Sequence, residues 1–213
     1  MELIGMLDSP YVRRVAVSLQ YLGVPFRHRA LSVFRTFGEF RAINPVVKAP
    51  TLVLDDGTVL MDSTLILEYA ESLVPGHAAL LPRAGRERAA ALRLVGLALA
   101  ACEKSVQIIY ERNLRPPERM HPPWIERVTG QLLAAYGALE GELESTLALL
   151  GGVRITQAHI STAVAWNFTQ QTLPEVVPVA GYPRLAAFSA RHEPLPEFAA
   201  APFGDGTYQG REP

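Results

Sequence analysis

The hydrophobic pattern differs between the first and the second part of the chain, and this difference limits the possible folds more than any other feature. In the first part, short apolar runs typical of strands alternate with apolar residues spaced three and four apart, as in amphipathic helices. After residue 87 only the helical spacing remains. The sequence therefore predicts a mixed α/β part in the order βαβαββα, followed by an all-α part. The expected strands cover residues 2–7, 25–31, 50–54 and 58–61, and the expected helices of the first part cover 10–23, 37–43 and 63–73.

Local signals set the limits of several of these elements. Pro10 follows Ser9, and such a serine–proline pair favours the start of a helix, while Gly23 favours its C-terminal cap. The pair Asp56 and Gly57 is a strong signal for a tight turn between two antiparallel strands. These signals agree with the limits that the hydrophobic period predicts.

A stretch without periodicity separates the two parts. Residues 74–85 contain two prolines and two glycines, a composition typical of a linker between domains. We therefore expect a first domain of residues 1–76, a linker of residues 77–86 and a helical domain of residues 87–213. In the helical domain, apolar residues at steps of three and four predict two long helices joined by a proline-rich loop over 111–123.

Composition excludes several classes of function. The 213 residues include 20 Lys and Arg against 21 Asp and Glu, and the net charge of -1 gives no reason to expect nucleic acid or a membrane surface as a partner. The single cysteine, Cys102, cannot form an internal disulfide, and the five histidines lack the spacing of a metal site. The N-terminal residues lack the features of a secretory signal, and no apolar run reaches the roughly 18 residues of a membrane span. We expect a cytoplasmic protein without a bound metal.

Ser9 has two possible roles at the start of the first helix. The simpler one is that of a helix cap, in which its hydroxyl accepts a hydrogen bond from a free backbone N–H. The other is binding, because a hydroxyl beside exposed amides at the positive end of a helix dipole is well placed to hold an anion. Local sequence alone leaves both roles open.

Three further motifs, taken together, resemble the glutathione transferases. The segment from Ser9 to Arg13 reads SPYVR and is similar to the S/C-P-F/Y motif of that family at the first strand-to-helix turn. The segment from Asn44 to Leu52 is similar to the family pattern N-P-x-x-K-V-P-x-L, with alanine in place of valine before Pro50. The pair Asp62 and Ser63 at a helix start resembles the acidic-serine pair of the family. The resemblance implies a thioredoxin-like N-terminal domain followed by an α-helical domain.

The resemblance also implies a role for each matched residue. Ser9 would direct its hydroxyl at the glutathione sulfur and stabilise the thiolate, not act as a nucleophile itself. Lys48 would place a charge near the glycyl carboxylate. The backbone of Ala49, before a cis Pro50, would pair with the peptide as an added strand does. Asp62 and Ser63 would hold the γ-glutamyl end, the serine at the helix N-terminus taking its carboxylate.

The implied activity is conjugation of the glutathione thiolate to small hydrophobic electrophiles by a homodimer. Two alternatives stay open: glutathione-dependent reduction of peroxides or disulfides, and a non-catalytic binding protein of the same fold. The family places the electrophile between the two domains, which nominates Tyr11, Gln107, Tyr110 and Asn113. The last three lie on one helical face, at spacings of three.

Other residues have simpler interpretations. Cys102 and Trp166 are expected in the core of the helical domain. Arg13 and Arg14 are expected on a solvated or salt-bridged helix face, and Phe34 and Phe37 in packing contacts, with contact between glutathione and Arg13 or Phe34 left open.

A capping box is expected at Thr156, where the family has an acid three residues later and this chain has His159. A neutral imidazole can accept the hydrogen bond of the box, whereas a protonated one at a helix N-terminus is unfavourable.

Overall fold

A four-stranded mixed sheet forms the centre of the first of two compact units, which comprises Met1–Leu80 and the segment that starts at Glu193. The structure, a computed structural model, describes residues 1–76, 78–151 and 154–210. In the sheet, β1 pairs in parallel with β2 and antiparallel with β3, and β3 pairs antiparallel with β4, in the order β2-β1-β3-β4. The strands are β1 (Glu2–Ile4), β2 (Arg27–Arg29), β3 (Thr51–Val53) and β4 (Val59–Met61).

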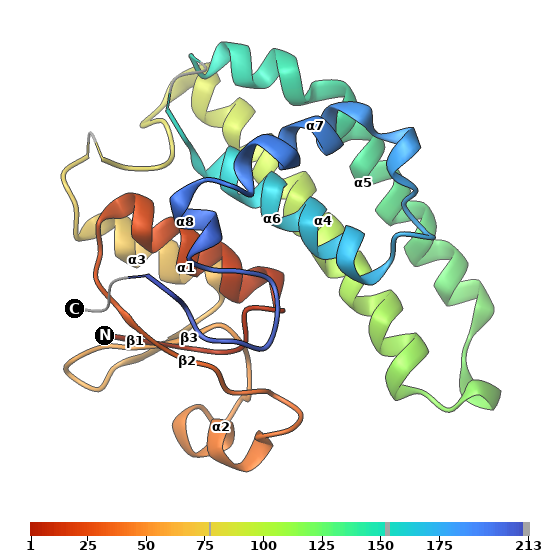
Figure 1. Cartoon of the computed structure of the whole chain (residues 1–213), viewed down its shortest axis with the longest axis horizontal. Helices are drawn as coiled ribbons and strands as arrows, with labels where there is room; N and C mark the ends of the chain where they lie inside the picture. The colour runs from red at the N-terminus through yellow and green to blue at the C-terminus, as the bar shows by residue number, and fades with distance from the viewer. Residues whose placement is uncertain (77, 152–153, 211–213) are drawn as a thin grey trace. The chain divides into compact units, whose positions relative to one another are not determined.

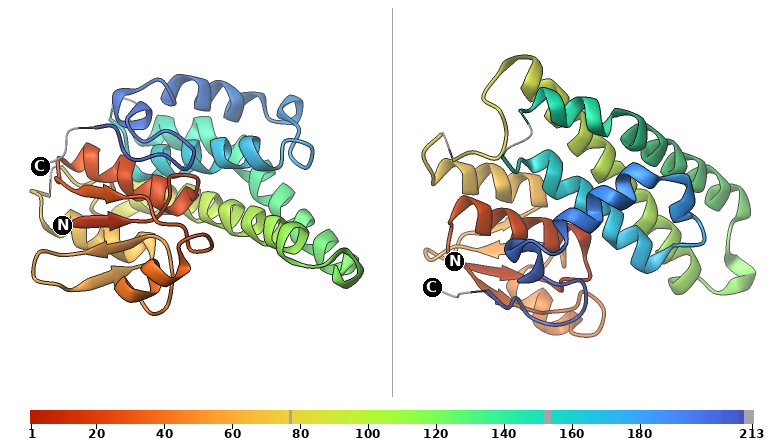
Figure 2. Two further views of the ribbon diagram at one scale, coloured as in Figure 1. Left: turned by 60° about the horizontal axis from the view of Figure 1, so that its bottom comes forward. Right: turned by 45° about the horizontal axis from the view of Figure 1, so that its top comes forward.

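Helices cover both faces of this sheet (Figures 1 and 2). The helices α1 (Pro10–Leu22) and α3 (Ser63–Ser72) pack side by side on one face, and α2 (Phe37–Ile43) lies on the other. Under α2, the buried side chains of Ile4, Leu31 and Phe40 form a hydrophobic cluster. The order βαβαββα that the hydrophobic period predicts is thus confirmed, with strands shorter than expected.

Within the first unit, the segment that starts at Glu193 packs next to α1. Its short helix α8 (Pro196–Ala199) places Phe198 against Tyr21 of α1, with ring centroids 6.3 Å apart. Farther along, the ring of Tyr208 lies 4.7 Å from that of Phe26, and the Tyr208 N–H donates to Nδ1 of His28 over 2.9 Å. The structure therefore groups this segment with the sheet, whereas the sequence-based division assigns it to the helical domain 87–213.

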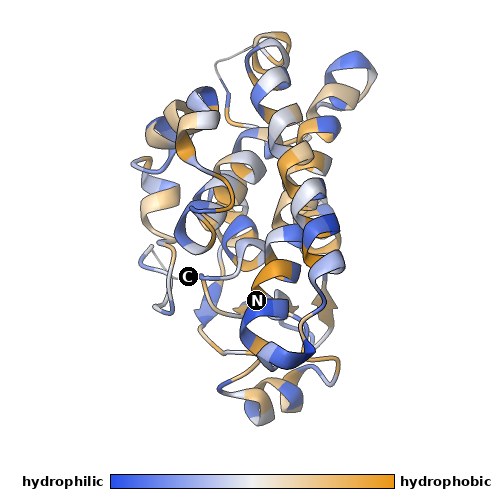
Figure 3. Cartoon of the chain, turned by 90° about the vertical axis from the view of Figure 1, so that its right-hand side faces the viewer, coloured by the Kyte–Doolittle hydropathy of each residue, from blue (hydrophilic) through white to orange (hydrophobic). Residues whose placement is uncertain are grey.

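The second unit, Leu81–His192, is helical throughout its regular elements. Hydrophobic and hydrophilic residues both occur along its helices, as expected of helices with one apolar face (Figure 3). Within this unit α4 packs against α5 and α6, and α7 packs against α5 and α6. The predicted loop over 111–123 is shorter in the structure, because α4 continues to Leu114. The elements are α4 (Gly85–Leu114), η1 (Pro117–Arg119), α5 (Pro122–Leu149), α6 (Gln157–Thr172), η2 (Val179–Gly181) and α7 (Pro183–His192). His77, at the first position of the predicted linker, lies outside the described residues.

The core of the helical unit is mainly aliphatic and also contains buried aromatic and small polar side chains. Cys102 and Trp166 are both buried, as expected from the sequence. Tyr136 is fully buried, and its hydroxyl lies 2.6 Å from Oγ1 of Thr169 and 2.9 Å from the carbonyl oxygen of Ala165. The buried hydroxyl is therefore satisfied, as a polar group in a core must be.

The predicted capping box at the start of α6 is present. The Thr156 N–H donates to Nδ1 of His159 over 3.2 Å, in the place where an acid would normally accept. His159 is buried, and burial, with a smaller contribution from His192, lowers its pKa to about 4. The imidazole is therefore neutral near pH 7 and can accept this hydrogen bond.

Candidate functional site

Ser9 is the N-terminal cap of α1 and is half-buried. Its N–H donates to the carbonyl of Met6 over 3.1 Å, and its Oγ accepts from the N–H of Val12 over a long 3.4 Å. The cap role expected from the sequence is therefore present. Within the described residues, however, the hydroxyl hydrogen of Ser9 has no acceptor. The side chain can thus cap the helix and still donate one hydrogen bond to a ligand.

Gly5 fixes the path of the chain between β1 and α1. Its φ of +137° is a conformation that other residues rarely adopt, and a Cβ at this position would lie 2.6 Å from a methyl carbon of Val12. The Gly5 carbonyl accepts from Nε2 of His28 over 2.7 Å. Because Nδ1 of His28 accepts from Tyr208, Nε2 carries the proton and donates. The close approach of Gly5 to Val12 sets the position of the first turn of α1, and hence of Ser9.

Hydrogen bonds that start from Asn44 hold the loop that carries Lys48, Ala49 and Pro50. The buried amide of Asn44 donates to Oγ1 of Thr51 over 2.8 Å, and this hydroxyl in turn donates to the Lys48 carbonyl over 2.7 Å. The bond between Ala49 and Pro50 is cis, as the resemblance implies. Neither the N–H nor the C=O of Ala49 is hydrogen-bonded within the part of the chain that the structure describes. Both groups are available to pair with an extended peptide.

Asp62 and Ser63 lie at the N-terminus of α3, as predicted. Asp62 is its cap and accepts from the N–H of Thr64 over 2.9 Å, with a φ of +75° that is unusual outside glycine. Its second carboxylate oxygen lies 3.6 Å from Nζ of Lys48, and both side chains are about half exposed. The structure thus brings together two residues that the resemblance assigns to opposite ends of the peptide.

The two arginines after Ser9 are buried, so the expectation of a solvated face is wrong for both. Arg14 donates from Nη1 to the hydroxyls of Ser63 and Thr64, over 2.8 and 3.1 Å. It therefore ties α1 to the start of α3 and fixes the rotamer of the buried Ser63. Sequence reasoning missed this role, although an arginine in the apolar stripe of a helix signals a buried partner.

Arg13 is an arginine with every nitrogen engaged. Its Nε donates to the Ala201 carbonyl over 2.7 Å, and Nη1 and Nη2 donate to the two carboxylate oxygens of Glu193 over 3.0 and 2.6 Å. The guanidinium also lies 5.9 Å from the ring centroid of Phe198. The salt bridge expected for this residue exists, but it is buried and holds the C-terminal segment to α1.

Phe34 and Phe37 are exposed, with 54% and 48% of their surface accessible, so the prediction that they pack is wrong. They lie in and just after the loop between β2 and α2, whose apolar contribution to the core comes from Leu31 and Phe40 instead. Helical periodicity could not separate these neighbours, because α2 has only seven residues.

The four residues nominated for the electrophile pocket lie in different units. Tyr11 belongs to the first turn of α1, whereas Gln107, Tyr110 and Asn113 follow one another along α4. Tyr110 and Asn113 are exposed, and the Gln107 amide donates to the carboxylate of Glu103 over 2.9 Å. The pocket itself stays a prediction.

Other kinds of site find no support in the described residues. Over the ranges that the structure describes, no group of three or more His, Cys, Asp or Glu side chains could hold a metal ion. No helix in those same ranges combines the length and the hydropathy that crossing a membrane requires.

Comparison with known proteins identifies the family. The family described as Glutathione S-transferase, N-terminal domain, matches residues 3–78, and Glutathione S-transferase, C-terminal domain, matches residues 122–191. A crystal structure of a glutathione transferase family member from Pseudomonas fluorescens Pf-5 with bound glutathione is 31% identical, with a TM-score of 0.82 over 94% of this chain and 97% of that one. The chain belongs to the glutathione transferase family.

Two curated relatives are similar to the chain over two thirds of its length or more. An uncharacterized GST-like protein, YibF, of Escherichia coli K12 is 27% identical over 169 residues, which are 79% of this chain and 83% of the relative. Maleylacetoacetate isomerase of Pseudomonas aeruginosa is 31% identical over 150 residues, which are 67% of this chain and 70% of the relative.

Proposed function

We propose that the protein binds glutathione in its first unit and transfers the glutathione thiolate to small hydrophobic electrophiles. The observation that carries this proposal is the hydroxyl of Ser9, which sits at the first turn of α1 with its hydrogen unused by the described residues. A free thiol has a pKa of about 8.5, so a bound thiol must be made more acidic to react at neutral pH. Each unit of lowering needs only about 1.4 kcal/mol, which one charge-assisted hydrogen bond can supply.

The remaining candidates would hold the two ends of the tripeptide. Ala49 offers an unpaired N–H and C=O for the backbone of the ligand, which supports an arrangement like an added strand. Ser63, oriented by Arg14 at the N-terminus of α3, would take the γ-glutamyl carboxylate. Asp62 would accept from the γ-glutamyl ammonium, and Lys48 would place its charge near the glycyl carboxylate. The exposed ion pair between Lys48 and Asp62 would open when the ligand binds.

Family membership supports two further proposals about the whole protein. We propose that it acts as a homodimer in the cytoplasm. Gel filtration with light scattering would test the first of these, and the expected result is a particle of twice the chain mass.

Two substitutions of Ser9 separate catalysis from helix capping. Ser9→Ala removes both the cap and the donor, and it should lower kcat/KM about 10- to 100-fold, the loss of one hydrogen bond to a developing or bound anion. Ser9→Asp keeps a good helix cap but cannot donate to a thiolate. If the hydroxyl stabilises the thiolate, Ser9→Asp should be at least as slow as Ser9→Ala, with thermal stability near that of the wild type.

The assay needs a model aryl halide, glutathione and a matched control. Ser72→Ala also removes a serine hydroxyl from the first unit, in this case one that bonds the Tyr69 carbonyl near the end of α3, and should leave the rate unchanged. An active Ser9→Asp protein would show that the hydroxyl serves only as a cap. Absence of any shift in Tm with millimolar glutathione would contradict glutathione binding altogether.

The isomerase relative favours a second candidate reaction. In it the thiolate would add reversibly to a conjugated double bond of the substrate and leave again after rotation about the weakened bond, so that glutathione is recovered. Mass spectrometry of the products distinguishes the two. Conjugation gives a product that contains glutathione, formed with loss of the halide and the thiol proton when the electrophile is an aryl halide, whereas isomerisation leaves the substrate mass unchanged.

A further inference from the structure

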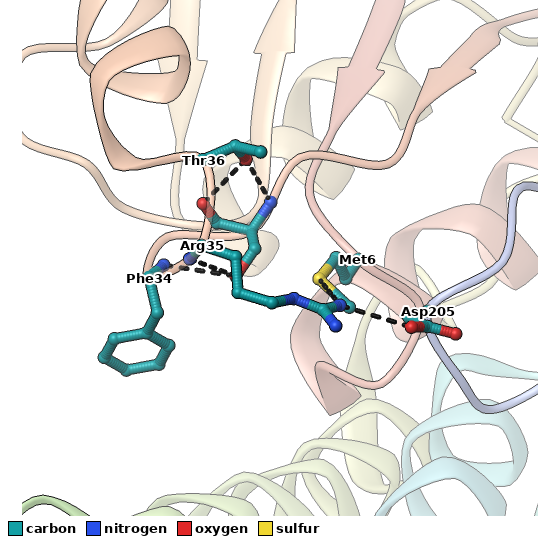
Figure 4. Close-up of polar contacts among 6 residues, drawn as sticks. Met6, Phe34, Arg35, Thr36 and Asp205 are labelled. Carbon is teal, nitrogen blue, oxygen red and sulfur yellow. Dashed lines mark hydrogen bonds and ion pairs between the residues drawn. The ribbon is translucent and has the colours of Figure 1, made fainter.

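The loop before α2 is built so that Arg35 points toward the turn that carries Ser9. The Ser32 hydroxyl accepts from the N–H groups of Phe34 and Arg35, over 3.2 and 3.0 Å. The Thr36 hydroxyl accepts from the Ser32 N–H over 2.8 Å and donates back to the Ser32 carbonyl over 3.0 Å. As Figure 4 shows, these bonds close the loop on itself, with the Phe34 ring and the Arg35 guanidinium directed apart.

The guanidinium of Arg35 touches two segments that are distant in sequence. Its Nη2 lies 3.4 Å from the sulfur of Met6 and 3.2 Å from Oδ2 of Asp205 (Figure 4). Met6 belongs to the turn before α1, since its carbonyl accepts the N–H of Ser9. A positive charge therefore lies at the turn that presents the Ser9 hydroxyl, and the C-terminal segment supplies its counter-ion.

Asp205 is kept near this turn by fixed points on both sides. Before it, the Ala201 carbonyl accepts from the buried Arg13, and after it, the Tyr208 N–H donates to the buried His28. The connecting stretch is short, so the carboxylate of Asp205 stays within reach of Arg35.

Arg35 has spare donors, in contrast to Arg13. All three nitrogens of Arg13 are bonded and its side chain is buried. Arg35 is 65% exposed and makes both of its contacts through Nη2, so that within the described residues its Nε and Nη1 have no hydrogen-bond partner. An arginine offers five N–H donors in a planar fork that suits anions. Arg35 is thus placed and equipped to bind an anion besides Asp205.

The local charge explains why Asp205 would have to give way. A second carboxylate, Asp8, lies in the same cluster: partial burial raises its pKa, Arg35 lowers it and Asp205 raises it. Asp8 therefore adds a second negative charge within electrostatic range of the ion pair between Arg35 and Asp205. A further anion at Arg35 would meet repulsion from both carboxylates unless the ion pair between Arg35 and Asp205 opened.

We infer that Asp205 is an internal counter-ion that competes with an anionic group of bound glutathione for Arg35. The inference rests on the proposed glutathione binding. The C-terminal segment would then weaken the affinity for glutathione, because the carboxylate of Asp205 neutralises the charge of Arg35 and repels an incoming anion while the ion pair is closed. The pair is exposed on both sides, so the competition is modest and reversible.

Isothermal titration of glutathione into four proteins tests this inference. Asp205→Asn should tighten binding about two- to five-fold, the range that an exposed ion pair supports. Arg35→Gln should weaken binding, and adding Asp205→Asn to Arg35→Gln should cause no further change. Gain of affinity is informative because a merely structural disturbance of the segment would weaken binding instead.

Glu39→Gln is the matched control. Glu39 pairs with Arg29 at 3.7 Å on the same unit, and both side chains of that pair are also exposed. Its removal changes the net charge equally and should leave the affinity within about 1.3-fold of the wild type, as a distant exposed charge is largely screened. Equal tightening by Glu39→Gln, or by Asp205→Asn in the Arg35→Gln background, would overturn the competition and leave only a general charge effect.

Two ligand analogues identify the competing anion. S-methylglutathione lacks the thiol, and the glycyl ethyl ester of glutathione lacks one carboxylate. If Asp205→Asn does not tighten the binding of one analogue, the group that this analogue lacks is the one that contacts Arg35. If the wild type binds glutathione and Ser9→Ala is slow, but Asp205→Asn binds glutathione as the wild type does, then the role of Asp205 is refuted and the proposed function still stands. A wild type that does not bind glutathione refutes the proposed function as well.

Discussion

His159 makes the stability of the helical unit depend on pH in a direction that the structure fixes. Its pKa is lowered from 6.5 to about 4, mainly by burial and secondarily by His192, whose ring centroid is 5.6 Å away. The folded protein therefore binds a proton at this site less readily than the unfolded chain does. Its stabilising contribution is complete above the unfolded pKa of about 6.5 and is lost as pH falls toward the folded value.

The size of the effect follows from the two pKa values. A shift from 6.5 to about 4 corresponds to a total of about 3 kcal/mol in the free energy of unfolding. Between about pH 7.5 and about pH 5, the loss from this one group is about 2 kcal/mol. Protonation would also abolish the acceptor that the Thr156 N–H uses, because both ring nitrogens of an imidazolium are donors.

His159→Gln isolates this contribution. A glutamine at the third position of a helix can still complete a capping box with Thr156, but it does not titrate. Urea unfolding followed by tryptophan fluorescence, which reports on the buried Trp166 of the same unit, measures the free energy of unfolding at the two pH values. The wild type should lose about 2 kcal/mol more than His159→Gln on acidification.

The matched control is His121→Gln, which removes an exposed histidine of the same unit and should keep the wild-type response. If the wild type and His159→Gln lose the same free energy to within about 0.5 kcal/mol, the imidazole is not the group that makes the unit sensitive to acid.

Two further predictions concern the first unit. Arg13→Met should lower the free energy of unfolding by about 2–4 kcal/mol, because it leaves the partly buried carboxylate of Glu193 without its charge partner; a loss below about 1 kcal/mol in chemical denaturation would contradict a structural role. Gly5→Ala should cost about 2–5 kcal/mol through its clash with Val12 and its positive φ. Gly38→Ala is the control, because Gly38 lies in α2 and a Cβ there would meet no atom within 4 Å. This variant should be neutral or more stable by about 0.5–1 kcal/mol. Equal losses of stability in the two variants would refute the steric argument.

Features that depend on neighbours in sequence could be predicted from the sequence. Gly23 adopts the left-handed conformation expected of a helix cap, with a φ of 67°. His159 replaces the usual acid of a capping box and still completes it, since the box joins residues three positions apart. The candidate Ser9 stands at a helix start for the same reason: the serine–proline signal is local.

Features that depend on distant contacts could not be predicted. The sequence predicts a solvated or salt-bridged helix face for Arg13 and Arg14 but not their burial or their partners, because Glu193 and Ser63 lie 180 and 49 positions away. No local pattern marks such pairs. The sequence does not indicate the position of Arg35 either, because its contact with Met6 depends on a loop that is closed by its own side-chain hydrogen bonds.

The attachment of the C-terminal segment to α1 affects the order in which the two units can fold. The helical unit lies in the sequence between the two pieces of the first unit, so that it is an insertion within that unit. During translation, the strands and α1 leave the ribosome long before Glu193 does. Until Glu193 has emerged, the guanidinium of Arg13 cannot form its ion pair with that carboxylate. Contacts of such long sequence separation form late, since the whole intervening chain must be closed into a loop first. The helical unit can therefore complete its fold before the first unit does, although the first unit is synthesised earlier.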